Sequence, residues 1–249
     1  MENTVDNVEI VIFAGGVGRR MTGSKRPKQF LELSGRPIID YTIEKYATHP
    51  QVTRIVISCL ASWISYLEHW LIGRHYSIPI DIIPGGATGQ ESIFRGVSHL
   101  RNQHPGDMDA IVLIHDGVRP LISEEAISAC IESARDRGPT ATIAQASETI
   151  VLMDEEGRVT DVLPRSRCGL ARAPQGFRLE ELYAAHLRAN DERKGDFVDS
   201  ISLMSYYGYD IYTVTGPSEN IKVTTPMDYY AFKGYMEAHD QESLWKDSE

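Results

Sequence analysis

Short apolar runs alternate with amphipathic segments through most of this chain, and this alternation limits the folds available to it. The runs are typical of strands buried on both faces, and they cover residues 9–13, 54–59, 78–83 and 110–115. Helical spacing of apolar side chains lies between them, at residues 37–48, at Trp63, Tyr66, Leu67 and Trp70, and at residues 92–101. This order predicts a mostly parallel α/β sheet covered by helices on both faces. Ligands of such sheets bind at the carboxyl ends of the strands.

The alternation is interrupted once, in the second half of the chain. Residues 149–154 and 158–163 are two short β-like runs around a turn at residues 155–157, which predicts a β-hairpin that projects as an arm. Helices are then predicted over residues 179–190 and 198–207, a strand over 211–214 and a last helix from Pro226 to about residue 239. The last ten residues are polar, and we expect them to fray. No composition shift or linker divides the 249 residues, so one domain is predicted.

Charge and cysteine content exclude several classes of protein. The chain has 35 acidic and 25 basic residues and a net charge of −10, which argues against a nucleic-acid binder that works through its overall charge. Its three cysteines form no C-x-x-C pair, so neither a disulfide framework nor a zinc site is expected. Neither a signal peptide nor a membrane span is recognisable, and we expect a soluble cytoplasmic protein.

A glycine-rich, basic loop follows the first predicted strand. Ala14-Gly15-Gly16-Val17-Gly18 is followed by five basic residues between positions 19 and 28, and no acidic residue lies between Glu9 and Glu32. Glycines allow backbone N–H groups to approach an anion closely, so this loop is a candidate phosphate site. The alternative is a surface turn with solvated charges. The sequence matches neither a Walker A loop nor G-x-G-x-x-G.

Five motifs in order resemble those of the methylerythritol-phosphate and pentitol-phosphate cytidylyltransferase family. They are A-G-G-x-G-x-R-M with P-K-Q at residues 14–29, Gly85-Gly86 with Ser92, H-D-x-x-R-P at 115–120, P-Q-x-F at 174–177 and N-I-K-V-T-x-P at 220–226. The resemblance implies a Rossmann-like nucleotidyltransferase fold. It also implies in-line attack by an acceptor phosphate on the α-phosphorus of CTP, with loss of pyrophosphate and with Mg²⁺ or another divalent cation between the phosphates.

The resemblance also assigns roles to individual residues. Arg20 and Lys28 match the residues that stabilise the transition state, and Lys222 matches a lysine near the acceptor phosphate. Arg165 matches the arginine that positions the acceptor, with Arg167 as the alternative. The nucleotide is expected on Ala14, Gly15, Gly16, Val17, Gly18, Gly85, Gly86, Ser92 and Asp116. In this family the segment that carries the acceptor arginine crosses to the other subunit, which implies a homodimer with an arm within about residues 145–172.

Some of these residues also have a structural interpretation. Asp116 is the candidate metal ligand, but it could instead cap a turn or pair with Arg119. Lys222 could be an exposed lysine at a strand end, and His115 is more typical of a structural histidine than of a base. Asp107 and Asp109 precede a predicted strand rather than follow it, so we interpret them as loop residues and not as a glycosyltransferase Asp-x-Asp.

Several residues depart from the family pattern, Gly89 where cytosine and ribose are held and the others where the acceptor is expected. Gly89 replaces an arginine, Ala173 replaces a threonine, and Asp199 is retained within an altered segment, where it could bond an acceptor hydroxyl or begin a helix. Gly117-Val118 and residues 220–226 look closer to the branch that uses ribitol 5-phosphate and makes CDP-ribitol for teichoic acids and capsules. The alternatives are methylerythritol 4-phosphate, another pentitol phosphate, or a nucleotide-binding module without catalysis.

Overall fold

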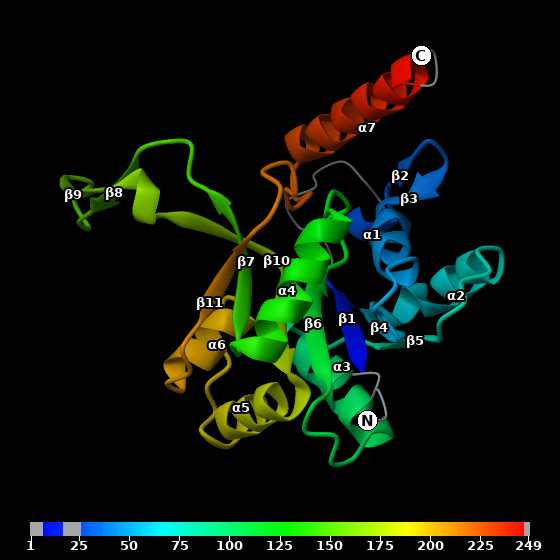
Figure 1. Cartoon of the computed structure of the whole chain (residues 1–249), viewed down its shortest axis with the longest axis horizontal. Helices are drawn as coiled ribbons and strands as arrows, with labels where there is room; N and C mark the ends of the chain where they lie inside the picture. Colours follow the sequence, from blue (N-terminus) through cyan, green and yellow to red (C-terminus); the bar gives the residue numbers. More distant parts are fainter. Residues whose placement is uncertain (1–6, 17–25, 247–249) are drawn as a thin grey trace.

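A seven-stranded sheet forms the centre of the molecule in the computed structural model, which describes residues 7–16 and 26–246 (Figure 1). Its strand order is β11-β7-β10-β6-β1-β4-β5, and neighbouring strands are parallel except where β10 is involved. The strands are β1 (Val8–Ala14), β4 (Arg54–Cys59), β5 (Ile80–Pro84), β6 (Ile111–Asp116), β7 (Thr140–Gln145), β10 (Gly169–Arg178) and β11 (Tyr212–Thr215). The predicted, mostly parallel sheet is confirmed.

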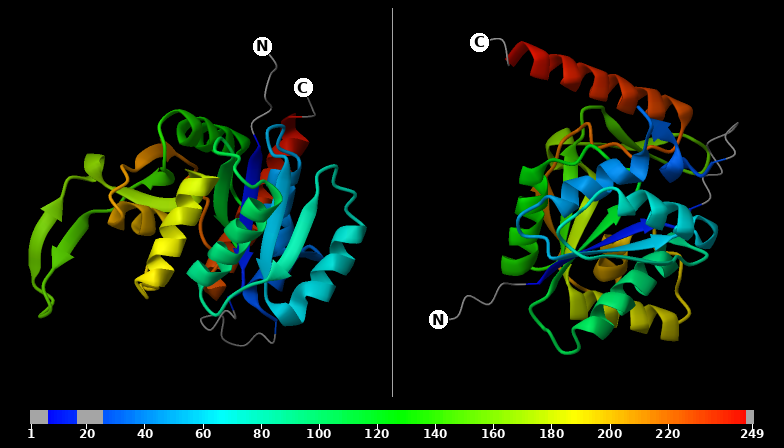
Figure 2. Two further views of the ribbon diagram at one scale, coloured as in Figure 1. Left: turned by 90° about the horizontal axis from the view of Figure 1, so that it is seen from below. Right: turned by 90° about the vertical axis from the view of Figure 1, so that its right-hand side faces the viewer.

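Helices cover both faces of this sheet (Figure 2). One face carries α1 (Ile38–Ala47), α2 (Ile64–Ile72) and α4 (Glu124–Asp136), and the other carries α3 (Gly89–Gln103), α5 (Leu179–Asp191) and α6 (Ser200–Tyr206). Alternate residues of β1 pack against the two helix layers, which explains why its sequence is apolar apart from Glu9. Ile10 and Ile12 pack in the first layer, and Val11 packs in the second.

The long strand β10 was not predicted. It runs antiparallel between β6 and β7, and its register shifts between Ala171 and Gln175. Because β10 runs against its neighbours, its first half lies beside their carboxyl ends. The strand therefore delivers side chains to the edge of the sheet where ligands are expected.

The predicted hairpin is present and projects from the body of the molecule (Figures 1 and 2). Strands β8 (Ile150–Met153) and β9 (Val159–Leu163) pair with each other outside the main sheet, and the 3₁₀ turn η3 (Arg165–Arg167) follows them. Several apolar side chains of this hairpin are exposed, namely Val151, Leu152, Met153, Val159 and Val162.

The last helix, α7 (Pro226–Lys246), begins where the sequence predicts. Asp228 accepts hydrogen bonds from the backbone N–H groups of Thr224 and Thr225, at 2.9 and 2.7 Å. The helix continues into the segment that was expected to fray, so that expectation is wrong for residues 240–246. None of the helices in the described residues has the length and apolar character needed to cross a membrane.

Short elements complete the chain and lie near the base of α7 and around α1. They are η1 (Lys28–Phe30), β2 (Glu32–Leu33), β3 (Arg36–Pro37) and η2 (Ala61–Trp63). Phe232 of α7 packs with Leu33, Ile38 and Val223 in a third apolar cluster. Cys59, Cys130 and Cys168 are free thiols.

Candidate functional site

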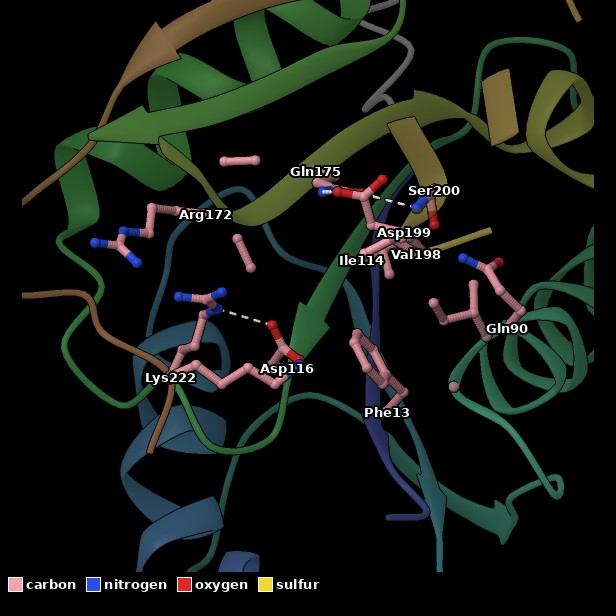
Figure 3. A pocket seen from close by; sticks show the side chains of 15 residues that line it. Phe13, Gln90, Ile114, Asp116, Arg172, Gln175, Val198, Asp199, Ser200 and Lys222 are labelled. Atoms are coloured by element: carbon pink, nitrogen blue, oxygen red, sulfur yellow. Dashed lines mark hydrogen bonds and ion pairs between the residues drawn. The ribbon is translucent and has the colours of Figure 1, made fainter. Parts of the chain in front are cut away.

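A cavity of about 350 Å³ lies at the carboxyl ends of β1 and β6 and at the first half of β10 (Figure 3). Within this sheet, β4 follows β1 along the chain and lies on one side of it, whereas β6 lies on the other side of β1. The cavity is therefore at the point where the strand order reverses. That is the expected ligand position in an open α/β sheet. Its lining residues are Phe13, Gly89, Gln90, Ile93, Ile114, Asp116, Arg119, Ala171, Arg172, Ala173, Gln175, Val198, Asp199, Ser200 and Lys222.

Asp116 is the central charged group of this cavity. Its carboxylate accepts a 2.8 Å hydrogen bond from Arg119 Nε and forms an ion pair with Lys222 Nζ. Burial by itself opposes ionisation, but Lys222 and Arg119 together outweigh it and lower the pKa of Asp116 to about 2. Asp116 is therefore an anion at neutral pH. The pairing with Arg119, which the sequence offered as the alternative to metal binding, is present; the predicted role of Asp116 as a metal ligand stays a prediction.

Hydrogen bonds of Asn220 and Val223 hold the chain segment that carries Lys222. Asn220 Nδ2 donates to the carbonyl of Ala173 at 2.7 Å, and the carbonyl of Asn220 accepts from Arg119 Nη1 at 3.1 Å. The N–H of Val223 donates to the carbonyl of Val118 at 2.9 Å. Lys222 is thus held between β10 and the loop after β6, which argues against the alternative of a freely exposed lysine.

His115 is a structural residue, as the sequence suggested. Its Nδ1 lies 2.7 Å from the Tyr46 hydroxyl, and its Nε2 lies 3.0 Å from the carbonyl of Arg119. Burial lowers the pKa of His115 to about 4, so the ring is neutral at pH 7. Both ring nitrogens have partners, and neither is available as a base.

The two glycine loops meet next to the cavity. A Cβ on Gly15 would lie 2.8 Å from Ser92 Oγ, and a Cβ on Gly85 would lie 3.3 Å from Gly15 Cα. Ser92 Oγ accepts from the N–H of Gly86 at 3.0 Å and donates to the carbonyl of Thr88 at 2.9 Å. The structure thus brings together the predicted residues Gly15, Gly85, Gly86 and Ser92, which pack too tightly for larger side chains.

Gln29 holds the described part of the first loop in shape. Its buried Nε2 donates to the carbonyls of Ala14 and Gly16, at 2.6 and 3.1 Å. The P-K-Q motif could have indicated this role of Gln29, which was not predicted. Lys28, the first residue of η1, comes directly before it. Val17, Gly18 and Arg20 lie outside the described residues.

The beginning of α3 forms one end of the cavity. The helix starts at Gly89, three residues earlier than predicted, because Thr88 is its N-cap and accepts from the N–H of Glu91 at 3.1 Å. A Cβ on Gly89 would lie 3.9 Å from the ring of Phe13, so a longer side chain would project across this end. With glycine at position 89, this end of the cavity stays open. The backbone N–H groups at the start of α3 lie at this end, where they can bind an anion.

Gln175 and Asp199 shape the opposite side of the cavity. Gln175 Nε2 donates to Asp199 Oδ2 at 3.1 Å, and Gln175 Oε1 accepts from the N–H of Ser200 at 3.2 Å. Asp199 is also the N-cap of α6, where its Oδ1 accepts from the N–H of Ser202 at 2.9 Å. The helix thus starts at Ser200 rather than Val198. Asp199 begins a helix, which was one of the two expectations for it, and it also lines the cavity. Its hydrogen bond to an acceptor hydroxyl stays a prediction.

Arg165 is not brought to this cavity by its own chain. It lies in η3 beyond the hairpin, where its Nη1 donates to the carbonyl of Ser147 at 2.8 Å. Within the described residues, the lining includes neither Arg165 nor Lys28. Their roles in the reaction therefore stay predictions.

Unsatisfied polar atoms belong to residues of the cavity wall. Gln90 Oε1, Arg172 Nε and Ser200 Oγ are buried without a hydrogen-bond partner among the described residues. Buried polar atoms rarely stay unpaired, so a polar ligand is the natural partner for them. Arg172 was not predicted as a site residue, because the strand that contains it, β10, was not predicted either.

Comparison with known proteins agrees with this geometry. A family model described as 2-C-methyl-D-erythritol 4-phosphate cytidylyltransferase (IspD) matches residues 8–238. A relative from Vibrio parahaemolyticus named ribitol-5-phosphate cytidylyltransferase is 44% identical over 92% of this chain and 96% of its own length. A protein of the same name from Streptococcus agalactiae serotype V is 41% identical over 94% of this chain and 97% of its own. A Bacillus licheniformis protein named 2-C-methyl-D-erythritol 4-phosphate cytidylyltransferase is 33% identical over 93% and 96%.

Solved structures show the same fold. The 4-diphosphocytidyl-2C-methyl-D-erythritol synthase of Anaerococcus prevotii superimposes with a TM-score of 0.80 at 24% identity, over 94% of this chain and 97% of that chain. The 2-C-methyl-D-erythritol 4-phosphate cytidylyltransferase of Francisella tularensis gives a TM-score of 0.73 at 25% identity, over 92% and 100%. The family model, the strand order and the position of the cavity where that order reverses all agree. This chain belongs to the IspD family of cytidylyltransferases.

Proposed function

We propose that this protein is a cytidylyltransferase that joins CTP and ribitol 5-phosphate to give CDP-ribitol and pyrophosphate. The observation that carries the proposal is the convergence of Asp116, Arg119 and Lys222 beside two closely packed glycine loops. Ribitol 5-phosphate is favoured over methylerythritol 4-phosphate because the Vibrio and Streptococcus relatives named for the ribitol substrate are 41–44% identical, whereas a Bacillus relative named for methylerythritol is 33% identical. A more distant protein named for the ribitol substrate, from Lactiplantibacillus plantarum, is 31% identical.

The chemistry requires positioning more than proton transfer. A phosphate oxygen of the acceptor forms a bond to the α-phosphorus of CTP, and the bond from that phosphorus to the bridging oxygen of pyrophosphate breaks. A phosphomonoester has a second pKa of about 6 and is already a dianion at neutral pH, so no base is needed. Negative charge increases around the α-phosphate, where Lys28 and Arg20 are proposed to stabilise it, while Lys222 is proposed to lie near the acceptor phosphate.

A divalent cation, with Mg²⁺ as our choice, fits the donor chemistry of this site. The described residues hold no group of three or more His, Cys, Asp and Glu arranged for a metal ion. Magnesium in phosphate-transfer sites is commonly bound by one or two carboxylates plus substrate phosphates, and Asp116 would be the ionised carboxylate that holds it. When bound, the cation would neutralise part of the triphosphate charge.

We also propose that two copies of the chain form a homodimer through the arm. The hairpin exposes Leu152, Met153 and Val162 to 49%, 64% and 56%, which is unusual for an isolated two-stranded element. Arg165 follows this hairpin and lies away from its own cavity. A second copy of the chain would cover these apolar side chains. Arg165 of the first copy would then lie beside the acceptor bound in the cavity of the second copy.

Pyrophosphate release tests the function. CTP and Mg²⁺ are supplied with ribitol 5-phosphate and, separately, with methylerythritol 4-phosphate. Release with the ribitol ester alone supports the proposal. Release only with methylerythritol phosphate would move the chain to the other branch, and CTP binding without any release would favour a non-catalytic nucleotide-binding module.

A further inference from the structure

Arg172 is a cation inside the cavity without a described partner. It lies at the register shift of β10, between Ala171 and Ala173, and its Nε is buried without a hydrogen-bond partner among the described residues. The side chain is half-buried and lines the cavity. Figure 3 shows Arg172 at one end of the cavity, Gln90 at the other and Asp116 between them.

The charges around Arg172 do not compensate for it. The cavity is lined by three cations, Arg119, Arg172 and Lys222, and by two carboxylates. Asp116 already binds Arg119 and Lys222, while Asp199 caps α6 and accepts from Gln175. Burial and the nearby charge of Arg119 both lower the pKa of Arg172. A guanidinium stays protonated in proteins, so this position lacks an anion.

The position of Arg172 indicates which anion is missing. The nucleotide phosphates are expected at the glycine loops and the start of α3, the end of the cavity that carries Gln90. Arg172 lies at the other end, beyond Asp116. An acceptor that attacks the α-phosphate approaches from that side and brings its own phosphate. Asp199, a carboxylate on the cavity wall, suits hydroxyl groups rather than a phosphate.

We propose that Arg172 binds the phosphate of the acceptor. The inference deepens the proposed function and rests on it for the identity of the acceptor. A guanidinium offers two parallel N–H donors to a phosphate, which an ammonium does not. Arg172 belongs to the same chain as Asp116, so this contact needs no second subunit.

Steady-state kinetics of three variants test the proposal. In Arg172→Gln the KM for ribitol 5-phosphate rises roughly 10- to 100-fold, as expected for loss of a charge-assisted contact, while the dissociation constant of CTP changes less than about 2-fold. Arg172→Lys recovers part of the loss. Arg178→Gln is the matched control, because Arg178 lies at the far end of β10 and binds Asp109 and the carbonyl of Arg135. It leaves both constants unchanged.

A binding measurement separates this inference from the proposed function. Inorganic phosphate is titrated calorimetrically into the wild type and Arg172→Gln, both saturated with CTP. Weaker phosphate binding in the variant supports the role of Arg172 even if ribitol 5-phosphate proves to be the wrong acceptor. Unchanged phosphate binding and an unchanged acceptor KM overturn it. A loss of CTP binding equal to the loss of acceptor binding also overturns it, since Arg172 would then support the fold or the nucleotide.

Discussion

At the scale of single residues, the chemistry depends on how Asp116 is held. Arg119 and Lys222 bind the same carboxylate, so the negative charge of Asp116 orients both of these side chains. Without Asp116 the two cations would repel each other in a half-buried place. The short motifs of the sequence were sufficient to predict Asp116 and Lys222. They were not sufficient for Arg172, whose place in the cavity depends on the register shift of β10.

Lys28 is the residue whose substitution tests the charge-stabilisation part of the mechanism. We expect Lys28→Ala to lower turnover at least about 100-fold without loss of the folded state, because it removes one donor to the developing negative charge. Turnover is measured by pyrophosphate release at saturating substrates, and folding by circular dichroism.

Lys45→Ala is the control for this substitution. Lys45 is exposed on α1, so its removal should not change turnover. A near-normal rate in Lys28→Ala would exclude Lys28 from the mechanism.

At the scale of elements, apolar runs predicted β1, β4 and β6, because strands buried on both faces leave little choice of side chain. Strand β10 could not be predicted in this way. It contains Gly169, Arg172, Pro174 and Gln175, and only its second half is buried continuously. Its proline lies at the register shift, where a missing N–H is tolerated. Pairing with β6 and β7, rather than local sequence, defines this strand.

The contact between α3 and α5 makes stability depend on pH. His186 of α5 is buried, lies 5.4 Å from the ring of Phe94 and has no partner for its Nε2 among the described residues. Burial lowers its pKa to about 4. Between about pH 6.5, the pKa of the ring in the unfolded chain, and about pH 4, the unfolded chain binds a proton at His186 that the folded chain does not bind. The free energy of unfolding therefore falls as the pH falls through this range.

We expect His186→Leu to reduce this pH dependence. His186 and His115 should each lower the free energy of unfolding by about 2 kcal/mol when the pH falls from 7 to 5. Urea unfolding of the wild type and His186→Leu at the two pH values measures the difference. His69→Leu, on the exposed face of α2, is the control and should keep the wild-type slope. An undiminished slope in His186→Leu would show that the ring takes up its proton without unfolding.

At the scale of the whole molecule, charge and shape are unevenly distributed. The chain has a net charge of −10, yet cations outnumber carboxylates in its cavity, so substrate phosphates are attracted to one place on an otherwise acidic protein. Arg165 follows the arm and does not line that cavity. The sequence predicted the hairpin from its two β-like runs, but the relation of Arg165 to an acceptor site depends on a second chain.

Mixing two inactive variants tests whether the site is shared. Arg165→Ala should impair use of the acceptor more than CTP binding, and Asp116→Asn should abolish turnover. If the arm completes the partner's site, co-expression of the two variants restores about a quarter of the wild-type activity, because hybrid dimers contain one intact site. Activity no greater than the sum of the separate variants would mean that Arg165 acts within its own chain or not at all.

We propose that this site transfers a cytidylyl group to ribitol 5-phosphate in preference to methylerythritol 4-phosphate. A competition assay tests this preference: both acceptors are supplied at equal concentration with limiting CTP and Mg²⁺, and the two diphosphate products are quantified by mass spectrometry. The product ratio equals the ratio of kcat/KM values. We expect CDP-ribitol in excess by about 10-fold or more, because differential binding at a few acceptor contacts is sufficient for such a ratio. An excess of the methylerythritol product would contradict it.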